Sequence, residues 1–126
     1  GNPTGTTSTT GVMMGLAGSI TPANTRIFIS ISASMTNNTI ADGAKMQIRF
    51  GTGAAPSNAD ALTGTVAGSL LQATSAAANE NHPATCTAIV TGLTAGTAYW
   101  LDVGLAAITG GTASITDVSV SAHDIV

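Results

Sequence analysis

The sequence predicts an all-β domain, and three observations support this. In several segments of the 126 residues, apolar side chains occupy every second position, which is the pattern of a strand with one buried face. Gly, Pro, Asn and Asp separate these segments at short intervals and favour turns. No segment favours more than a single helical turn, near residues 58–62. We therefore expect about seven or eight strands that pack as a β-sandwich.

The first residues differ in composition from the rest. Residues 1–11, GNPTGTTSTTG, are too polar and too rich in Gly and Thr to form a core, so we predict a flexible arm there. The sandwich domain is then expected over residues 12–126. Its first strand is predicted over residues 12–20, interrupted by Gly15 and Gly18.

The clearest alternation runs over residues 26–35. It places Ile27, Ile29, Ile31, Ala33 and Met35 on one face, and Phe28 with three serines on the other. Residues 45–50 repeat the pattern and also predict a strand, with the apolar face composed of Met46, Ile48 and Phe50. We expect these two strands to be neighbours in one sheet.

Turn-forming residues delimit the remaining elements. We expect a long connection first, then a strand, an exposed loop that carries Glu80 and His82, and two further strands. The predicted ranges are 51–68 for the connection, 69–74 for the strand, 76–83 for the loop, and 85–91 and 113–122 for the two further strands.

Residues 99–105 are predicted to form the central strand. They include the only Tyr and the only Trp of the chain. The period of two puts Tyr99, Leu101, Val103 and Leu105 on one face. Trp100, Asp102 and Gly104 then point the other way, so we expect a half-buried strand.

Charge is scarce in this chain. Charged residues make up 7% of it, against roughly 25% in ordinary soluble domains. Three cations and a net charge of -3 do not predict a nucleic-acid surface, which needs clustered Lys and Arg. No run of about 20 apolar residues predicts a membrane span. Sheet edges without Lys invite pairing, so we expect a homo-oligomer, a trimer or a dimer.

The sequence contains no convincing catalytic or metal-binding set. The two histidines, His82 and His123, favour surface positions, and Cys86 favours a small buried side chain. Asp42 and Asp60 are expected in turns. We predict no catalytic residue, no cofactor and no metal site, and therefore no enzyme.

Three residues are candidates for an interface or a ligand platform: Phe28, Trp100 and Asp102. Trp100 with Phe28 is a candidate aromatic platform for a sugar ring, although packing under a loop or at an interface is favoured. For Asp102 we favour a cross-strand partner, Arg26 or Arg49, over a catalytic role.

Residues 93–103, LTAGTAYWLDV, resemble the penultimate strand of a fibronectin type III domain, whose Leu-x-Pro-Gly-x-x-Tyr pattern carries a corner tyrosine. Ala95 stands where that pattern has Pro, and no Trp occurs in an early strand.

A second resemblance covers nearly the whole chain. The segments TTGVMMGLAGSITPANTRIFISISASM, DGAKMQIRFGTGAAP, ALTGT and VTGLTAGTAYWLDVGLAAITGGTASITDVSVSA resemble small Thr/Ala/Gly-rich virion proteins and fibre-terminal domains of tailed bacteriophages. The resemblance implies a jelly-roll-like β-sandwich that works as an oligomer on the particle surface. It implies no catalytic residues.

Two functional hypotheses follow from this resemblance. The leading one is a virion structural protein that decorates or cements the capsid, on the virion surface after assembly in the host cytoplasm. Its partners would be further copies of itself and other virion proteins such as the major capsid protein. The alternative is a tail- or head-fibre tip adhesin that binds host-surface carbohydrate through loops 51–68 and 76–83.

Overall fold

In a computed structural model of the protein, which describes residues 2–126, the chain forms eight strands and no helix. This confirms the all-β prediction. The strands are β1 (Val12–Met13), β2 (Gly18–Ile20), β3 (Ile27–Asn37), β4 (Gly43–Gly51), β5 (Thr65–Thr74), β6 (His82–Val90), β7 (Tyr99–Ala107) and β8 (Ala113–Asp124).

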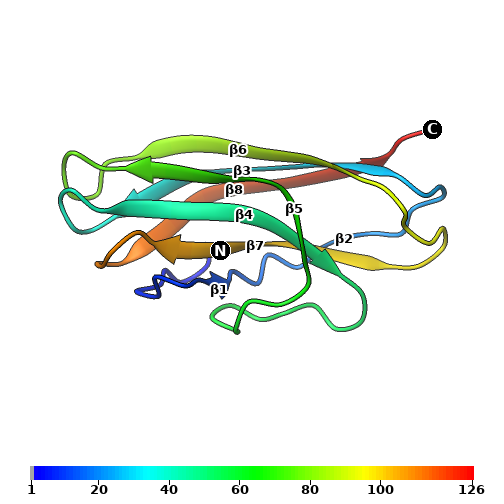
Figure 1. The fold of residues 1–126 in the computed structure, drawn as a ribbon, viewed down its shortest axis with the longest axis horizontal. Helices are drawn as coiled ribbons and strands as arrows, with labels where there is room; N and C mark the ends of the chain where they lie inside the picture. The colour runs from blue at the N-terminus through cyan, green and yellow to red at the C-terminus, as the bar shows by residue number, and fades with distance from the viewer. Residues whose placement is uncertain (1) are drawn as a thin grey trace.

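The strands form two antiparallel sheets that lie one above the other (Figure 1). The β3 sheet has the order β6-β3-β8. The β7 sheet has the order β1-β7-β4-β5, and β2 also pairs with β7. The arrangement confirms the β-sandwich, while a jelly-roll-like connectivity stays a prediction.

The core lies between the two sheets and is formed by the side chains that the alternation placed inward. Ile27, Ile29 and Ile31 of β3 are fully buried and face the β7 sheet. The buried residues of that second sheet include Met46, Ile48, Leu101, Val103 and Leu105. The assignment of faces from the period of two is thus confirmed for β3, β4 and β7.

The expected pairing of β3 with β4 is wrong. β3 pairs with β6 and β8, while β4 pairs with β5 and β7, so the two strands belong to opposite sheets. The period of two identifies the face that a strand buries but does not identify its neighbour. Two consecutive amphipathic strands can bury their faces by pairing or by facing each other across the core.

The expected strand over residues 12–20 is two short strands, β1 and β2, that pair with the same edge of β7. Gly15 (φ 69°) and Ala17 (φ 57°) between them have left-handed backbone conformations. A Cβ at Gly15 would lie 2.4 Å from the backbone nitrogen of Asn58. The interruption therefore follows from a close approach of two backbone segments.

The strands from β3 to β8 all extend beyond their expected ranges at one end or both. β5 begins at Thr65, β6 begins at His82 and β8 continues to Asp124. Most of the added residues do not alternate between apolar and polar side chains, which is why the pattern did not include them.

Residues 2–11, the predicted arm, lie against the sandwich. Thr6 exchanges two backbone hydrogen bonds with Ala113 of β8, and the amide of Ala107 donates to Ser8 O (2.8 Å). The amide of Thr4 donates to Asn58 Oδ1 (2.7 Å). These contacts join the arm to both sheets, and its flexibility stays a prediction. Gly1 lies outside the described residues.

β7 is central in its sheet, as predicted, but it is buried on both faces rather than one. Trp100 and Asp102, on the outward face, are only 7% and 1% exposed. A covering loop, residues 52–64, packs over this face, where Leu62 comes close to Gly104. Because this loop lacks alternation, the sequence did not indicate that it covers a strand.

Candidate functional site

The structure separates the two aromatic candidates. Phe28 lies on the outer side of β3, and Trp100 lies on β7 in the other sheet. The Phe28 ring instead contacts His123 of β8, with the ring centroids 5.3 Å apart. The two residues therefore do not form a shared aromatic platform.

Trp100 packs beneath the covering loop. Its indole Nε1 donates a hydrogen bond to the carbonyl oxygen of Thr52 (3.2 Å). The ring lies against Gly51 and Gly64, where an added Cβ would come within 2.6 Å and 2.4 Å of ring atoms. Packing under a loop, the favoured interpretation of Trp100, describes this position.

Asp102 lies directly opposite Arg49 in the strand register, yet the two form no ion pair. Its carboxylate accepts the backbone N–H groups of Gly15 (2.9 Å), Leu16 (3.1 Å) and Val103 (2.8 Å). Burial raises the pKa of Asp102 above its ordinary value of 3.8, and the backbone donors oppose that shift. The carboxylate thus holds the link between β1 and β2 against β7; Arg49 is its cross-strand neighbour, as expected, but forms no ion pair with it.

Tyr99 contacts the turn that precedes its own strand. Its hydroxyl oxygen accepts the backbone N–H of Thr94, five residues upstream, at 2.9 Å. The contact connects the turn before β7 to the strand. It is local, and a relationship to fibronectin type III domains stays a prediction.

Two polar side chains, Asn37 and Asp42, are buried at the opposite end of the sandwich. Asn37 donates from Nδ2 to the carbonyl oxygens of Gly43 and Gly110. Asp42 accepts N–H groups from Gly43, Ile108 and Thr109 as well as the Thr109 hydroxyl, which lowers its pKa from 3.8 to about 2. We predicted that Asp42 lies in a turn. We did not predict that it is buried and hydrogen-bonded to the connection between β7 and β8.

The remaining titratable candidates form no catalytic constellation in residues 2–126. Cys86 is buried on the inner side of β6, and burial raises the pKa of its thiol from 9.0 to about 11. His82 contacts Glu80 (3.0 Å), and both side chains are partly exposed. Within the described range no three His, Cys, Asp or Glu side chains gather in a way that could hold a metal ion. The same residues include no helix long and apolar enough to cross a membrane.

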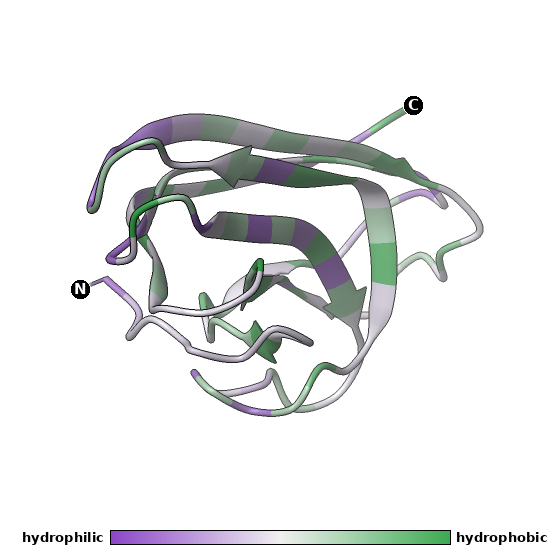
Figure 2. Cartoon of the chain, turned by 60° about the vertical axis from the view of Figure 1, so that its left-hand side comes forward, coloured by the Kyte–Doolittle hydropathy of each residue, from purple (hydrophilic) through white to green (hydrophobic). Residues whose placement is uncertain are grey.

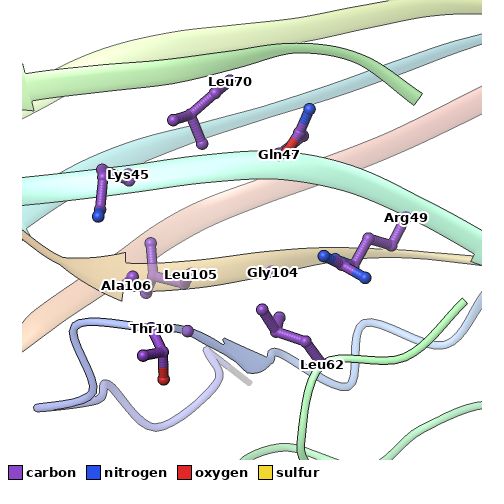
Figure 3. Close-up of a pocket in the computed structure, with 10 residues that line it drawn as sticks. Thr10, Lys45, Gln47, Arg49, Leu62, Leu70, Gly104, Leu105 and Ala106 are labelled. Carbon is purple, nitrogen blue, oxygen red and sulfur yellow. The ribbon is translucent and has the colours of Figure 1, made fainter. Parts of the chain in front are cut away.

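One recessed site lies on the outer side of the β7 sheet. Alternate residues of β4, namely Lys45, Gln47 and Arg49, point outward into a groove of about 190 Å³. Figure 3 shows Lys45 and Arg49 reaching from β4 over β7, with Leu62 and Leu70 on opposite sides. Figure 2 shows the same strand as alternating hydrophilic and hydrophobic bands. We call this site the β4 groove.

Each of the three β4 side chains in the β4 groove has a carbonyl acceptor. Arg49 donates to Thr63 O of the covering loop (3.2 Å), and Gln47 donates to Gly68 O (2.9 Å). Lys45 Nζ lies 3.4 Å from Thr9 O of the arm. The single ion pair found in residues 2–126 is the His82–Glu80 contact, so the two cations of the groove have no carboxylate partner.

The outer side of the β3 sheet has a different character. Cross-strand pairing aligns small side chains in rows, of which Thr87–Ser30–Ser121 and Thr85–Ser32–Ser119 are two. The strands β3, β6 and β8 contain no Lys, Arg or Glu, and Asp117 at a bulge is the carboxylate that lies among the serines. We call this the hydroxyl face; its members are Ser30, Ser32, Ser34, Thr85, Thr87, Thr116, Ser119 and Ser121.

Comparison with known proteins gives no assignment: neither a family model nor a curated protein sequence matches the chain.

Proposed function

We propose that the protein is a structural protein of a bacteriophage virion, a capsid decoration or cement subunit that packs against further copies and against the major capsid protein. The observation that carries this proposal is the hydroxyl face. It spans all three strands of the β3 sheet and has no cation to oppose a second protein surface.

Small hydroxyl side chains suit repeated packing for a physical reason. Ordering a Lys or Glu at an interface costs up to about 2 kcal/mol of side-chain entropy, and Ser loses far less. A serine hydroxyl also needs one partner on desolvation, whereas an unpaired charge is much more costly. The rows of Ser and Thr can therefore meet another surface at low cost.

The edges of the β3 sheet support the same proposal. β6 and β8 are its edge strands, and neither carries a Lys, the residue that commonly blocks edge-to-edge pairing. Thr6 of the arm pairs with Ala113 alone at the beginning of β8. Beyond that contact the β8 edge pairs with no other strand of residues 2–126 and can meet a neighbouring subunit, whereas β5 lies beside β6, where Gly68 approaches Thr87 O.

The direct test is the position of the chain in an intact particle. We expect antibody against the chain to label the capsid surface of particles from the phage or prophage that encodes it. A chain that is absent from purified particles, and monomeric by light scattering at high concentration, would contradict the proposal.

Removing the arm gives a second test of the same proposal. The arm contacts the sandwich through a few backbone and side-chain hydrogen bonds, so deleting residues 1–11 should weaken binding to particles that lack the protein while the sandwich still folds. Equal affinity with and without the arm would remove it from the adhesive surface. Circular dichroism of the truncated chain serves as the control for folding.

The adhesin alternative has less support. The expected platform is not assembled, because Trp100 is 7% exposed beneath the covering loop and Phe28 lies in the other sheet. Glycan-array binding that Trp100→Ala abolishes, with the oligomeric state unchanged, would nevertheless favour the adhesin.

A further inference from the structure

We propose that the β4 groove binds an extended acidic peptide segment of a partner protein, with two carboxylates on Lys45 and Arg49 and an apolar side chain between Leu62 and Leu70. This proposal does not depend on the proposed function. It concerns the outer side of the β7 sheet, which the hydroxyl face does not include.

The charge distribution is the first argument. The chain has three Lys and Arg residues and six Asp and Glu residues, yet two of the three cations line one groove. Both are held by carbonyl oxygens, which orient a cation without neutralising it. An acidic protein that places its cations together in this way presents a local positive site to an anionic partner.

Asp102, the register partner of Arg49, does not neutralise the site by direct pairing. Its carboxylate is 1% exposed, and its oxygens accept three backbone N–H groups. The guanidinium of Arg49 points instead to Thr63 O in the covering loop. The N–H groups of Arg49 that do not bond to Thr63 are donors for a carboxylate from outside.

The spacing is the second argument. Lys45 and Arg49 are four residues apart on β4, whose pairing with β7 is regular, and a strand rises about 3.3 Å per residue. The two cations are therefore about 13 Å apart along the strand. An extended peptide has the same rise, so carboxylates at its positions i and i+4 match both cations, and its position i+2 faces Gln47.

A β-bulge supplies the apolar wall. The pairing of β4 with β5 shifts between Met46 and Ile48, and Gly68 (φ 70°) lies in the bulge. Bulges commonly turn a side chain toward a new direction. Here Leu70 lies in the bulge, lines the groove and stays 50% exposed, which is costly without a partner.

The size of the groove favours a peptide side chain over a larger ligand. Its volume of about 190 Å³ is below the roughly 300 Å³ at which pockets for drug-sized molecules begin. No aromatic ring lines it on which a sugar could stack. A short extended segment needs space for only a few side chains.

The test is a titration of the full chain with a synthetic peptide, acetyl-Glu-Thr-Leu-Thr-Glu-amide, followed by ¹H–¹⁵N NMR. We expect shifts at Lys45, Gln47, Arg49 and Leu70, and weaker binding as salt rises. The same peptide with Gln in place of Glu should bind about tenfold more weakly, because two ion pairs are lost.

Two variants, one of them a double substitution, make the test specific. Lys45→Gln and Arg49→Gln together should reduce the affinity about tenfold, the effect of losing both ion pairs. Arg26→Gln removes the third cation, outside the groove, and should leave the affinity unchanged. All three substitutions are on the surface, and the amide spectrum verifies that each variant is folded.

Several results would overturn the proposal. These are the absence of shifts at millimolar peptide, equal binding of the Glu and Gln peptides, and equal loss on Arg26→Gln. An oligogalacturonate that binds the groove while the peptide does not would also overturn it and would identify an acidic sugar instead.

Discussion

The two outer faces of the sandwich differ in how far other segments of the chain cover them. The hydroxyl face on the β3 sheet is bare, with Thr85, Thr87, Ser119 and Ser121 exposed. The outer side of β7 is covered by the covering loop and by the link between β1 and β2, and it buries Trp100 and Asp102. The comparison shows that loops and links bury the outer face of one sheet and leave that of the other exposed.

This difference relates the covered side to the folding stability of the subunit and the bare side to its association with other subunits. On the covered side, side chains make specific hydrogen bonds to the loops, so a substitution there breaks contacts within the subunit. On the bare side, the side chains at the strand centres form no hydrogen bonds with other described residues, so a substitution there breaks none. We therefore expect covered-side variants to change folding and bare-side variants to change assembly.

The largest expected effect comes from Asp102→Asn on the covered side. An amide nitrogen cannot accept an N–H, so at least one of the backbone donors of Gly15, Leu16 and Val103 loses its partner. Leaving buried donors unpaired should cost about 3 kcal/mol, or roughly 10 °C in Tm. Calorimetry measures this, with Asp117→Asn on the bare side as the matched control. Equal Tm values for the two variants would contradict the comparison.

The next prediction separates the effect of packing against Trp100 from the effect of backbone strain, at two glycines of the covering loop. Gly64 (φ 76°) and Gly53 (φ 78°) have similar conformations, but a Cβ at Gly64 would lie 2.4 Å from the Trp100 ring, and one at Gly53 would contact nothing. Gly53→Ala should cost about 1 kcal/mol from strain alone, and Gly64→Ala about 3 kcal/mol. Urea unfolding followed by Trp100 fluorescence measures both. A Gly53 variant as unstable as the Gly64 variant would show that Trp100 is not tightly covered.

The pH dependence of stability should reflect two buried carboxylates with opposite shifts. The pKa of Asp42 is lowered from 3.8 to about 2, so the unfolded state binds more protons and stability falls as the pH drops from about 4 toward 2. The pKa of Asp102 is raised, so the folded state binds more protons and stability rises as the pH drops toward 3.8. Thermal unfolding across this range should show a rise and then a fall.

Single variants assign the two parts of that profile. Asp42→Asn should remove the fall below pH 4, and Asp102→Asn should remove the rise above it. A profile of unchanged shape in both variants would assign the pH dependence to other groups.

The faces of the strands were predictable from the sequence, and the partners were not. Ile27, Ile29 and Ile31 revealed the buried side of β3 because burial follows the period of two. Nothing in that period distinguishes a strand that pairs with β4 from one that faces it across the core. Partner choice depends on connections whose length and turns carry little pattern.

The candidate site was predictable only in part. The alternation showed that Lys45, Gln47 and Arg49 point outward together, and the register with Asp102 agrees with the predicted closeness of Arg49. The groove itself also needs Leu62, Leu70 and Thr10, which come from a loop, a bulge and the arm. Their approach is a tertiary feature that no local spacing encodes.

The smallest expected effect on stability, and the sharpest test of the bare face, comes from Ser32→Lys. Ser32 lies in the middle row of the hydroxyl face, between Thr85 and Ser119, and its side chain makes no hydrogen bond to residues 2–126. The free energy of unfolding should change by no more than about 0.5 kcal/mol, as is usual for such surface positions. Self-association, measured by sedimentation, should be lost, because a lysine with no carboxylate opposite it would have to be desolvated. Ser32→Thr keeps the hydroxyl and should keep the oligomer; an oligomer that survives Ser32→Lys would place the contact between subunits on another surface.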